Sequence, residues 1–150
     1  MKSFTKTDWL ALILVLIFFI SGVITLPEYG LSWDEGLGNM FFGERYVRYW
    51  SSFSDKYLDF KTDLDYHTQT PIDLSQSTWR EFPHVYPPFF DTVSAASMHL
   101  LSYKLNLLDP VDAFHFPSIA ISALLLWLLY LFAARYIGRV AALFSLLMLA

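Results

Sequence analysis

Two adjacent carboxylates, Asp34 and Glu35, are the residues of this sequence best suited to acid–base chemistry. A carboxylate placed near a hydroxyl group can remove its proton and so make the oxygen a nucleophile. A structural interpretation stands beside this one. Ser32 and Glu35 have the S-x-x-E spacing of a capping box, and Asp34 would favour the positive end of the same helix. The local sequence leaves both interpretations open.

A second polar element, His84 and Tyr86, comes directly before the adjacent prolines Pro87 and Pro88. Proline restricts the residue before it and is favoured in the first turn of a helix, so this stretch predicts a helix start. His84 and Tyr86 are candidates for substrate binding, or alternatively anchors at a membrane surface.

The sequence shows no metal-ligand set. It contains no cysteine, which excludes disulfides and thiolate metal sites. The histidines at 67, 84, 99 and 115 lack the paired spacing of metal ligands. A divalent metal cofactor stays an open alternative, but the sequence shows no set of ligands for it.

The composition is that of a membrane protein. Of 150 residues, 55 % are hydrophobic and 19 % aromatic, with a mean hydropathy of +0.42. The formal net charge of −4 argues against a nucleic-acid partner. The glycines at 36, 38 and 43 fit neither the dinucleotide-binding nor the P-loop spacing.

Two uncharged stretches are long enough to cross a bilayer. Trp9 to Leu26 would form a helix about 27 Å long at ~1.5 Å per residue, and residues 118–134 form a second predicted membrane helix. A cleaved signal peptide is the alternative for 9–26, although the apolar run is long for one. Residues 140–150 begin a further apolar helix, so we expect a longer polytopic protein.

Residues 87–108 are long enough to span but carry several polar side chains. Apolar residues recur at three- and four-residue steps, with Asp91, Ser94 and Ser102 off that stripe. The stripe consists of Phe89, Val93, Ala96, Leu100, Tyr103 and Leu107. We expect an interfacial helix whose apolar stripe docks on the bilayer or on neighbouring helices and whose polar side faces an outer cavity. A tilted spanning helix is the alternative.

The basic residues predict the orientation. Lys2 and Lys6 precede the first apolar stretch, and Arg135 and Arg139 follow the second. If residues 87–108 do not span, all four fall on the cytoplasmic side, as the positive-inside tendency favours.

The predicted fold class is therefore all-α. Membrane helices at 9–26 and 118–134 enclose an extracytoplasmic loop, 27–117, with interfacial helices at about 33–50 and 87–108. The N-terminus would be cytoplasmic, and the membrane would be the plasma (inner) membrane.

This order of elements resembles the start of the GT-C membrane glycosyltransferases that use polyprenyl-phosphate sugars. Protein O-mannosyltransferases and lipid A aminoarabinose transferases (glycosyltransferase family 39-like) are the named relatives. The resemblance rests on the Asp34-Glu35 pair after a membrane helix, the aromatic stretch that follows, and the broken His-Pro-Pro element at 84–88. Phe116-Pro117-Ser118 before the Leu-rich helix and the turn Tyr136-Ile137-Gly138-Arg139 add to it.

The resemblance implies that Asp34 is the catalytic base and that Glu35 orients the acceptor or holds the turn. The donor would be a lipid-linked sugar and the acceptor a hydroxyl or lipid group. The departing phosphate needs cationic partners, for which Arg45 and Arg48 are candidates, unless they are surface charges. The fragment alone would be inactive if donor-binding residues lie beyond Ala150.

Two other functions remain as alternatives. A non-catalytic membrane protein could use the outer loop to bind a partner, with Asp34 and Glu35 serving only as a cap. A transporter is less consistent with the sequence, because the uncharged stretches place no ionisable residue near the bilayer midplane.

Overall fold

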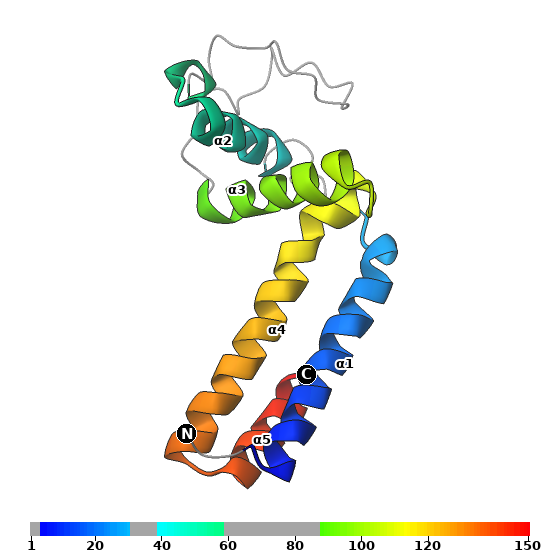
Figure 1. Cartoon of the computed structure of the whole chain (residues 1–150), viewed down its shortest axis with the longest axis vertical. Helices are drawn as coiled ribbons and strands as arrows, with labels where there is room; N and C mark the ends of the chain where they lie inside the picture. Colours follow the sequence, from blue (N-terminus) through cyan, green and yellow to red (C-terminus); the bar gives the residue numbers. More distant parts are fainter. Residues whose placement is uncertain (1–3, 31–38, 59–87) are drawn as a thin grey trace. The chain divides into compact units, whose positions relative to one another are not determined.

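The computed structural model describes residues 4–30, 39–58 and 88–150, which form helices and their connections without any strand. The all-α class is thus confirmed for the described part of the chain. The chain divides into two compact units, one formed by Met1–Glu28 and Phe116–Ala150 and the other by Tyr29–His115. Figure 1 shows their elements, and each unit is described separately.

The first unit contains α1 (Lys6–Thr25), which continues into a 3-10 turn, η1 (Leu26–Glu28). It also contains most of α4 (Pro110–Tyr136) and all of α5 (Arg139–Leu149). Two described helical stretches, Lys6–Glu28 and Pro110–Tyr136, are long and apolar enough to cross a membrane, and α5 is a shorter apolar helix.

The helix α4 begins earlier than the sequence predicted. Residues 110–117, expected in the outer loop, form its first turns. The start is explained by Asp109, whose Oδ1 accepts a hydrogen bond from the backbone N–H of Val111 at 3.0 Å, and by Pro110 in the first turn. Pro117 lies inside the helix, which continues through it despite the loss of one backbone donor.

The helices α1 and α4 run antiparallel within this unit. The start of α1 meets the end of α4 at Asp8 and Tyr130, whereas the end of α1 meets the start of the membrane stretch at Gly22 and Ile119. If both helices cross a bilayer, this packing puts Lys6 and Arg135 on the same side. The interfacial position of residues 87–108 stays a prediction.

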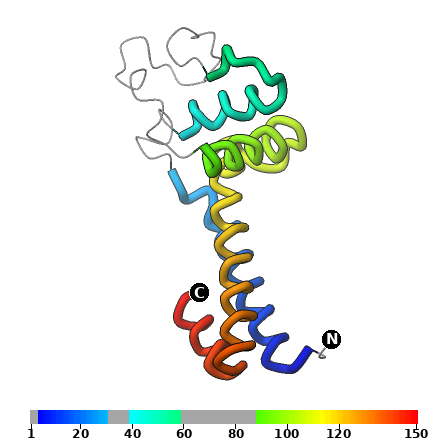
Figure 2. The backbone as a smooth tube through the Cα atoms, turned by 90° about the vertical axis from the view of Figure 1, so that its left-hand side faces the viewer, coloured from blue at the N-terminus to red at the C-terminus, as the bar shows by residue number. Residues whose placement is uncertain are grey.

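After α4 the chain turns back, as the tube in Figure 2 shows. The turn uses Gly138 at φ +131°, a conformation that residues with a side chain rarely adopt. The returning helix α5 packs against α1.

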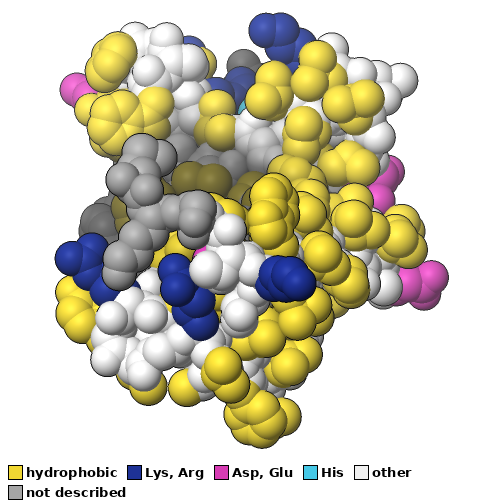
Figure 3. All heavy atoms as spheres, turned by 60° about the horizontal axis from the view of Figure 1, so that its bottom comes forward, with side chains coloured by type: hydrophobic (Ala, Val, Ile, Leu, Met, Phe, Trp, Pro, Cys, Tyr) yellow, Lys and Arg dark blue, Asp and Glu magenta, His cyan; other side chains and the backbone are white. Residues whose placement is uncertain are grey.

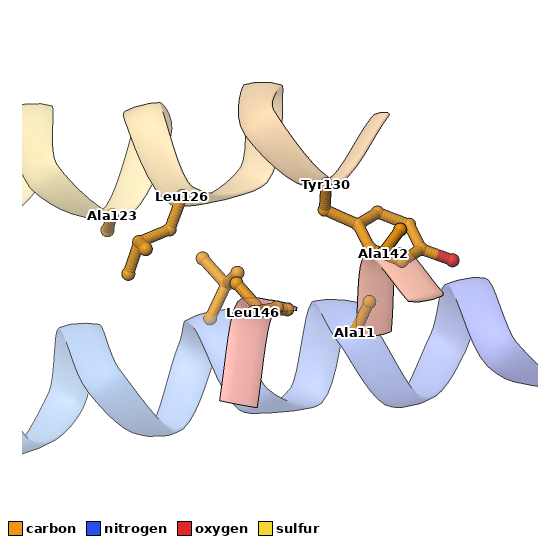
Figure 4. Packing of buried hydrophobic residues seen from close by; sticks show 7 residues of the cluster. Ala11, Ala123, Leu126, Tyr130, Ala142 and Leu146 are labelled. Carbon is orange, nitrogen blue, oxygen red and sulfur yellow. The ribbon is translucent and has the colours of Figure 1, made fainter. Parts of the chain in front are cut away.

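Small and large apolar side chains alternate in the core of the first unit. Ala11 and Ala142 are almost fully buried and let the helices approach, and Leu126, Tyr130 and Leu146 fill the space between them. Figure 4 shows these residues pointing toward one another from the three helices. Small residues at helix contacts are typical of membrane bundles, where close packing drives association.

A polar cluster at Asp8 ties the ends of these helices together. The helix α1 begins before Trp9, so Asp8 lies in its first turn and forms a capping box with Thr5. Asp8 Oδ2 accepts bonds from the Thr5 N–H (2.8 Å) and hydroxyl (2.7 Å). Asp8 Oδ1 accepts bonds from the Tyr130 hydroxyl (2.7 Å) and from Arg139 Nε (3.2 Å). This cluster was not predicted, because the uncharged run placed the start of the helix at Trp9, one residue after Asp8.

The outward faces of these helices are apolar. Exposed side chains include Trp9, Ile24 and Leu124, and apolar side chains cover much of the face seen in Figure 3. Exposed apolar area on this scale is typical of a surface that lies against lipid or another protein.

The second unit contains α2 (Met40–Ser52), a 3-10 turn, η3 (Asp55–Tyr57), and α3 (Pro88–Ser97). A π-helical segment, η6 (Met98–Lys104), continues α3. Asn106, at φ +52°, ends that segment in the left-handed conformation. Ala95 and Met98 pack with Ala113 and Phe114 in the first turns of α4.

The polar face of α3 and η6 does not lie where it was predicted. The polar side chains Asp91, Ser94 and Ser102 are buried in the unit rather than facing an outer cavity, so that expectation is wrong. The reason is the close packing of α3 on α2. The apolar residues Phe89 and Leu100 are exposed, as a bilayer-facing stripe requires, and their contact with lipid stays a prediction.

The contribution of the Tyr130–Asp8 hydrogen bond to stability can be tested by substitution. Tyr130→Phe removes one hydrogen bond to Asp8 while keeping the ring, and we expect it to lower the free energy of unfolding by about 1 kcal/mol. The matched control is Tyr136→Phe, because that tyrosine is 68 % exposed. Thermal unfolding in detergent measures both. Equal stability of the two variants would contradict a stabilising role for the Tyr130–Asp8 bond.

Candidate functional site

The contact between α2 and α3 depends on Gly43. A Cβ atom at this position would lie 2.3 Å from the backbone oxygen of Asp91 and 3.0 Å from the Cβ of Ala95. Because a backbone oxygen cannot move aside as a side chain can, a larger residue would push the helices apart. Gly43 therefore sets the closest approach of α2 and α3.

Asp91 is buried at this contact. The residue is 5 % exposed, and its Oδ2 atom has no hydrogen-bond partner among the described residues. Burial raises the pKa of Asp91 from 3.8 to about 6. On α2, the pKa of Tyr46 is also raised, by burial and then by the negative charge of Asp91. This carboxyl group therefore gains and loses a proton closer to neutral pH than an exposed aspartate.

Arg45, the candidate phosphate partner, is fully buried. Its Nε donates to the carbonyl of Tyr57 at 2.8 Å, and its terminal nitrogen donates to the carbonyl of Lys56 at 2.9 Å. The guanidinium carbon also lies 5.7 Å from the centre of the Phe41 ring. The alternative of a surface charge is wrong for Arg45, because these bonds hold it against the end of η3.

Glu44 joins two basic side chains. One carboxylate oxygen, Oε2, contacts His99 Nε2 on η6, and the other, Oε1, lies 3.6 Å from Arg48 one helical turn along α2. The Glu44 side chain is 13 % exposed, whereas those of His99 and Arg48 are each 36 % exposed. The mostly buried carboxylate of Glu44 thus orients the ring of His99, which is partly exposed to solvent.

The π-helical backbone carries His99. In η6 the hydrogen bonds extend one residue further than in an α-helix, as the bond from the Leu105 N–H to the Leu100 carbonyl at 3.0 Å shows. Such segments occur frequently at functional sites. The Tyr103 ring meets the His99 ring edge-on, with centroids 5.3 Å apart. Burial and the negative charges of Glu44 and Asp109 raise the pKa of Tyr103, so it stays a neutral phenol.

Four predicted site residues lie outside the described residues: Asp34, Glu35, His84 and Tyr86. The catalytic and the capping interpretations of the Asp34-Glu35 pair both stay predictions. Among the described residues, no group of three or more His, Cys, Asp or Glu side chains could hold a metal ion.

No chemical role was predicted for Glu44, His99 or Asp91. One signal was available, since Glu44 and Arg48 have the four-residue spacing of a helical ion pair. The contact of Glu44 with His99 had no such signal, because it joins residues 55 positions apart and depends on helix packing.

Comparisons with known proteins gave no match to a protein-family model, a curated protein or a solved structure. The class that the structure itself supports is an all-helical protein with two candidate membrane helices.

The Gly43 contact predicts a strong response to one methyl group. Gly43→Ala should lower the free energy of unfolding by about 1–3 kcal/mol, the usual cost of overpacking. Gly30→Ala is the control, because a Cβ there meets nothing within 4 Å. Chemical denaturation of both variants gives the comparison. A stable Gly43→Ala variant would show that the helices do not meet at this residue.

The burial of Asp91 predicts a pH dependence. The pKa of Asp91, raised from 3.8 to about 6, means that the folded state holds the proton more tightly than the unfolded chain. Its contribution to stability is therefore greatest below the unfolded value and is lost as the pH rises to about 6. Asp91→Asn cannot lose a proton, so its stability relative to the wild type should increase over this range.

Unfolding in denaturant at pH 4, 5, 6 and 7 measures this difference between the variant and the wild type. Asp112→Asn serves as the control for carboxyl removal. A difference for Asp91→Asn that does not change with pH would contradict the burial of an ionisable group there.

Proposed function

We propose that this chain is part of a membrane glycosyltransferase that moves a sugar from a polyprenyl phosphate to a hydroxyl-bearing acceptor at the outer membrane face. The proposal is supported by the resemblance of the sequence to the GT-C family and by the two candidate membrane helices. The polar unit that lies between these helices in the chain would hold the reaction.

The observation that carries the proposal is the inward placement of ionisable side chains in the second unit. Asp91 and Arg45 are buried, and Glu44 is mostly covered. Burying such groups costs free energy, whereas a loop that only connects two helices would leave them in water. Buried and aligned ionisable groups are typical of sites that move protons or bind polar ligands.

In the proposed mechanism, Asp34 removes the proton of the acceptor hydroxyl. The oxygen then bonds to the anomeric carbon of the donor sugar as the bond from that carbon to the phosphate oxygen breaks. The polyprenyl phosphate leaves with the bonding electrons, so its negative charge needs a cationic partner. Arg48 is better suited to this than Arg45, because Arg45 is fully buried and holds backbone carbonyls.

Asp34→Asn in the full-length protein tests the proposal. Asparagine keeps the size and the capping ability of aspartate but loses its basicity, and a positioned base contributes roughly 10²- to 10⁴-fold. We expect normal membrane insertion and a loss of at least about a hundredfold in transfer from a polyprenyl-phosphate sugar.

Glu28→Gln is the matched control, since it removes an exposed carboxylate at the end of η1. Turnover per folded molecule and melting temperature are measured together. Near-wild-type turnover of Asp34→Asn would show that the pair only caps a helix.

A further inference from the structure

The pairing of Glu44 and His99 fixes the hydrogen-bonding state of the imidazole ring. Glu44 lies 3.6 Å from Arg48, and a charged carboxylate of this kind only accepts hydrogen bonds. His99 Nε2, which contacts Glu44, must therefore carry a hydrogen. In the neutral ring this leaves the other nitrogen, Nδ1, as an acceptor with a free lone pair.

The Nδ1 atom is available to a ligand. The structure gives His99 Nδ1 no hydrogen-bond partner among the described residues, and the side chain is 36 % exposed. The Tyr103 ring lies edge-on beside the imidazole and limits its rotation. The contact with Glu44 thus orients an imidazole ring that is partly exposed to solvent.

We propose that Glu44 and His99 form a subsite in which His99 Nδ1 accepts a hydrogen bond from a hydroxyl group of the acceptor substrate. The inference rests on the proposed function for the identity of that substrate. The lone pair of Nδ1 suits an O–H donor, whereas the phosphodiester of a polyprenyl-phosphate sugar carries no proton to donate. His99 is thus a substrate-binding residue, and Glu44 is a positioning residue that acts through it.

Two substitutions at His99 distinguish a substrate-binding role of this residue from a purely structural role. In His99→Gln the amide reaches the place of Nε2 and can still donate to Glu44, but nothing replaces Nδ1. In His99→Asn the side-chain oxygen occupies about the place of Nδ1, while the contact with Glu44 is lost. A purely structural role predicts that Gln is tolerated and Asn is not, and the proposed subsite predicts the reverse.

Steady-state transfer by the full-length protein gives the first readout. The acceptor KM should rise about tenfold in His99→Gln, as the loss of one good hydrogen bond implies, with kcat changed less than about threefold. The acceptor KM of His99→Asn should stay within about threefold of the wild type. Lys104→Gln, an exposed change on the same π-helical segment, should leave KM unchanged. A tolerated Gln variant together with an impaired Asn variant would overturn the proposal.

A binding experiment separates failure of the subsite from failure of the proposed function. N-acetylserine amide and methyl α-mannopyranoside serve as hydroxyl probes, and saturation-transfer NMR detects their contact with the full-length protein in detergent. Binding that is lost in His99→Gln and retained in His99→Asn supports the subsite even if no sugar transfer is found. Transfer activity with the same acceptor KM in all three proteins would overturn the subsite and leave the proposed function standing. Absence of binding of either probe to the wild type would also overturn it.

Discussion

Gly43 allows the backbones of α2 and α3 to approach so closely that a methyl group would not fit between them. The rest of the second unit depends on this contact. Asp91 loses its water there, and the next residue on α2, Glu44, comes within reach of His99 on η6. Widening the contact would hydrate Asp91 and separate Glu44 from His99. The same packing thus controls both the buried carboxyl and the aligned histidine.

The second unit turns polar side chains inward and apolar side chains outward, which is the opposite of the usual arrangement in a water-soluble helix pair. Asp91 and Ser94 face inward, and Phe89 and Leu100 face outward. This order is expected of a surface that lies against lipid or another protein, because exposed apolar side chains gain nothing in water. Asp91 Oδ2 and the Ser94 hydroxyl oxygen have no hydrogen-bond partner among the described residues, so their burial costs free energy.

The sequence predicted the helical class because uncharged stretches of membrane length leave few alternatives to a helix. The predicted helix boundaries were less accurate, because individual capping side chains decide where a helix begins. The second membrane helix was predicted over residues 118–134, but α4 begins at Pro110, where the Asp109 side-chain oxygen caps the backbone. The apolar stripe of 87–108 was recognised, but the burial of the opposite, polar side was not predicted, since periodicity identifies a face without identifying what packs against it.

The candidate site was less predictable than the fold. Asp34 and Glu35 were found from their adjacency and from a resemblance, and they stay predictions. Glu44 and His99 required the packing of two helices, and Asp8 with Tyr130 required contact across 122 positions of sequence. Periodicity and capping rules act over a few residues, so they carry no information about such pairs.

The carboxylate of Asp8 also has a consequence for the order in which the chain is made. Oδ2 finds its partner in Thr5 as soon as the first helical turn forms, but the partners of Oδ1 are synthesised 122 and 131 positions later. Until Tyr130 and Arg139 arrive, that oxygen must stay hydrated or contact lipid headgroups, because hydrocarbon offers no donor. If α1 crosses a bilayer, its first turn would therefore stay at the water boundary until α4 and α5 are in place.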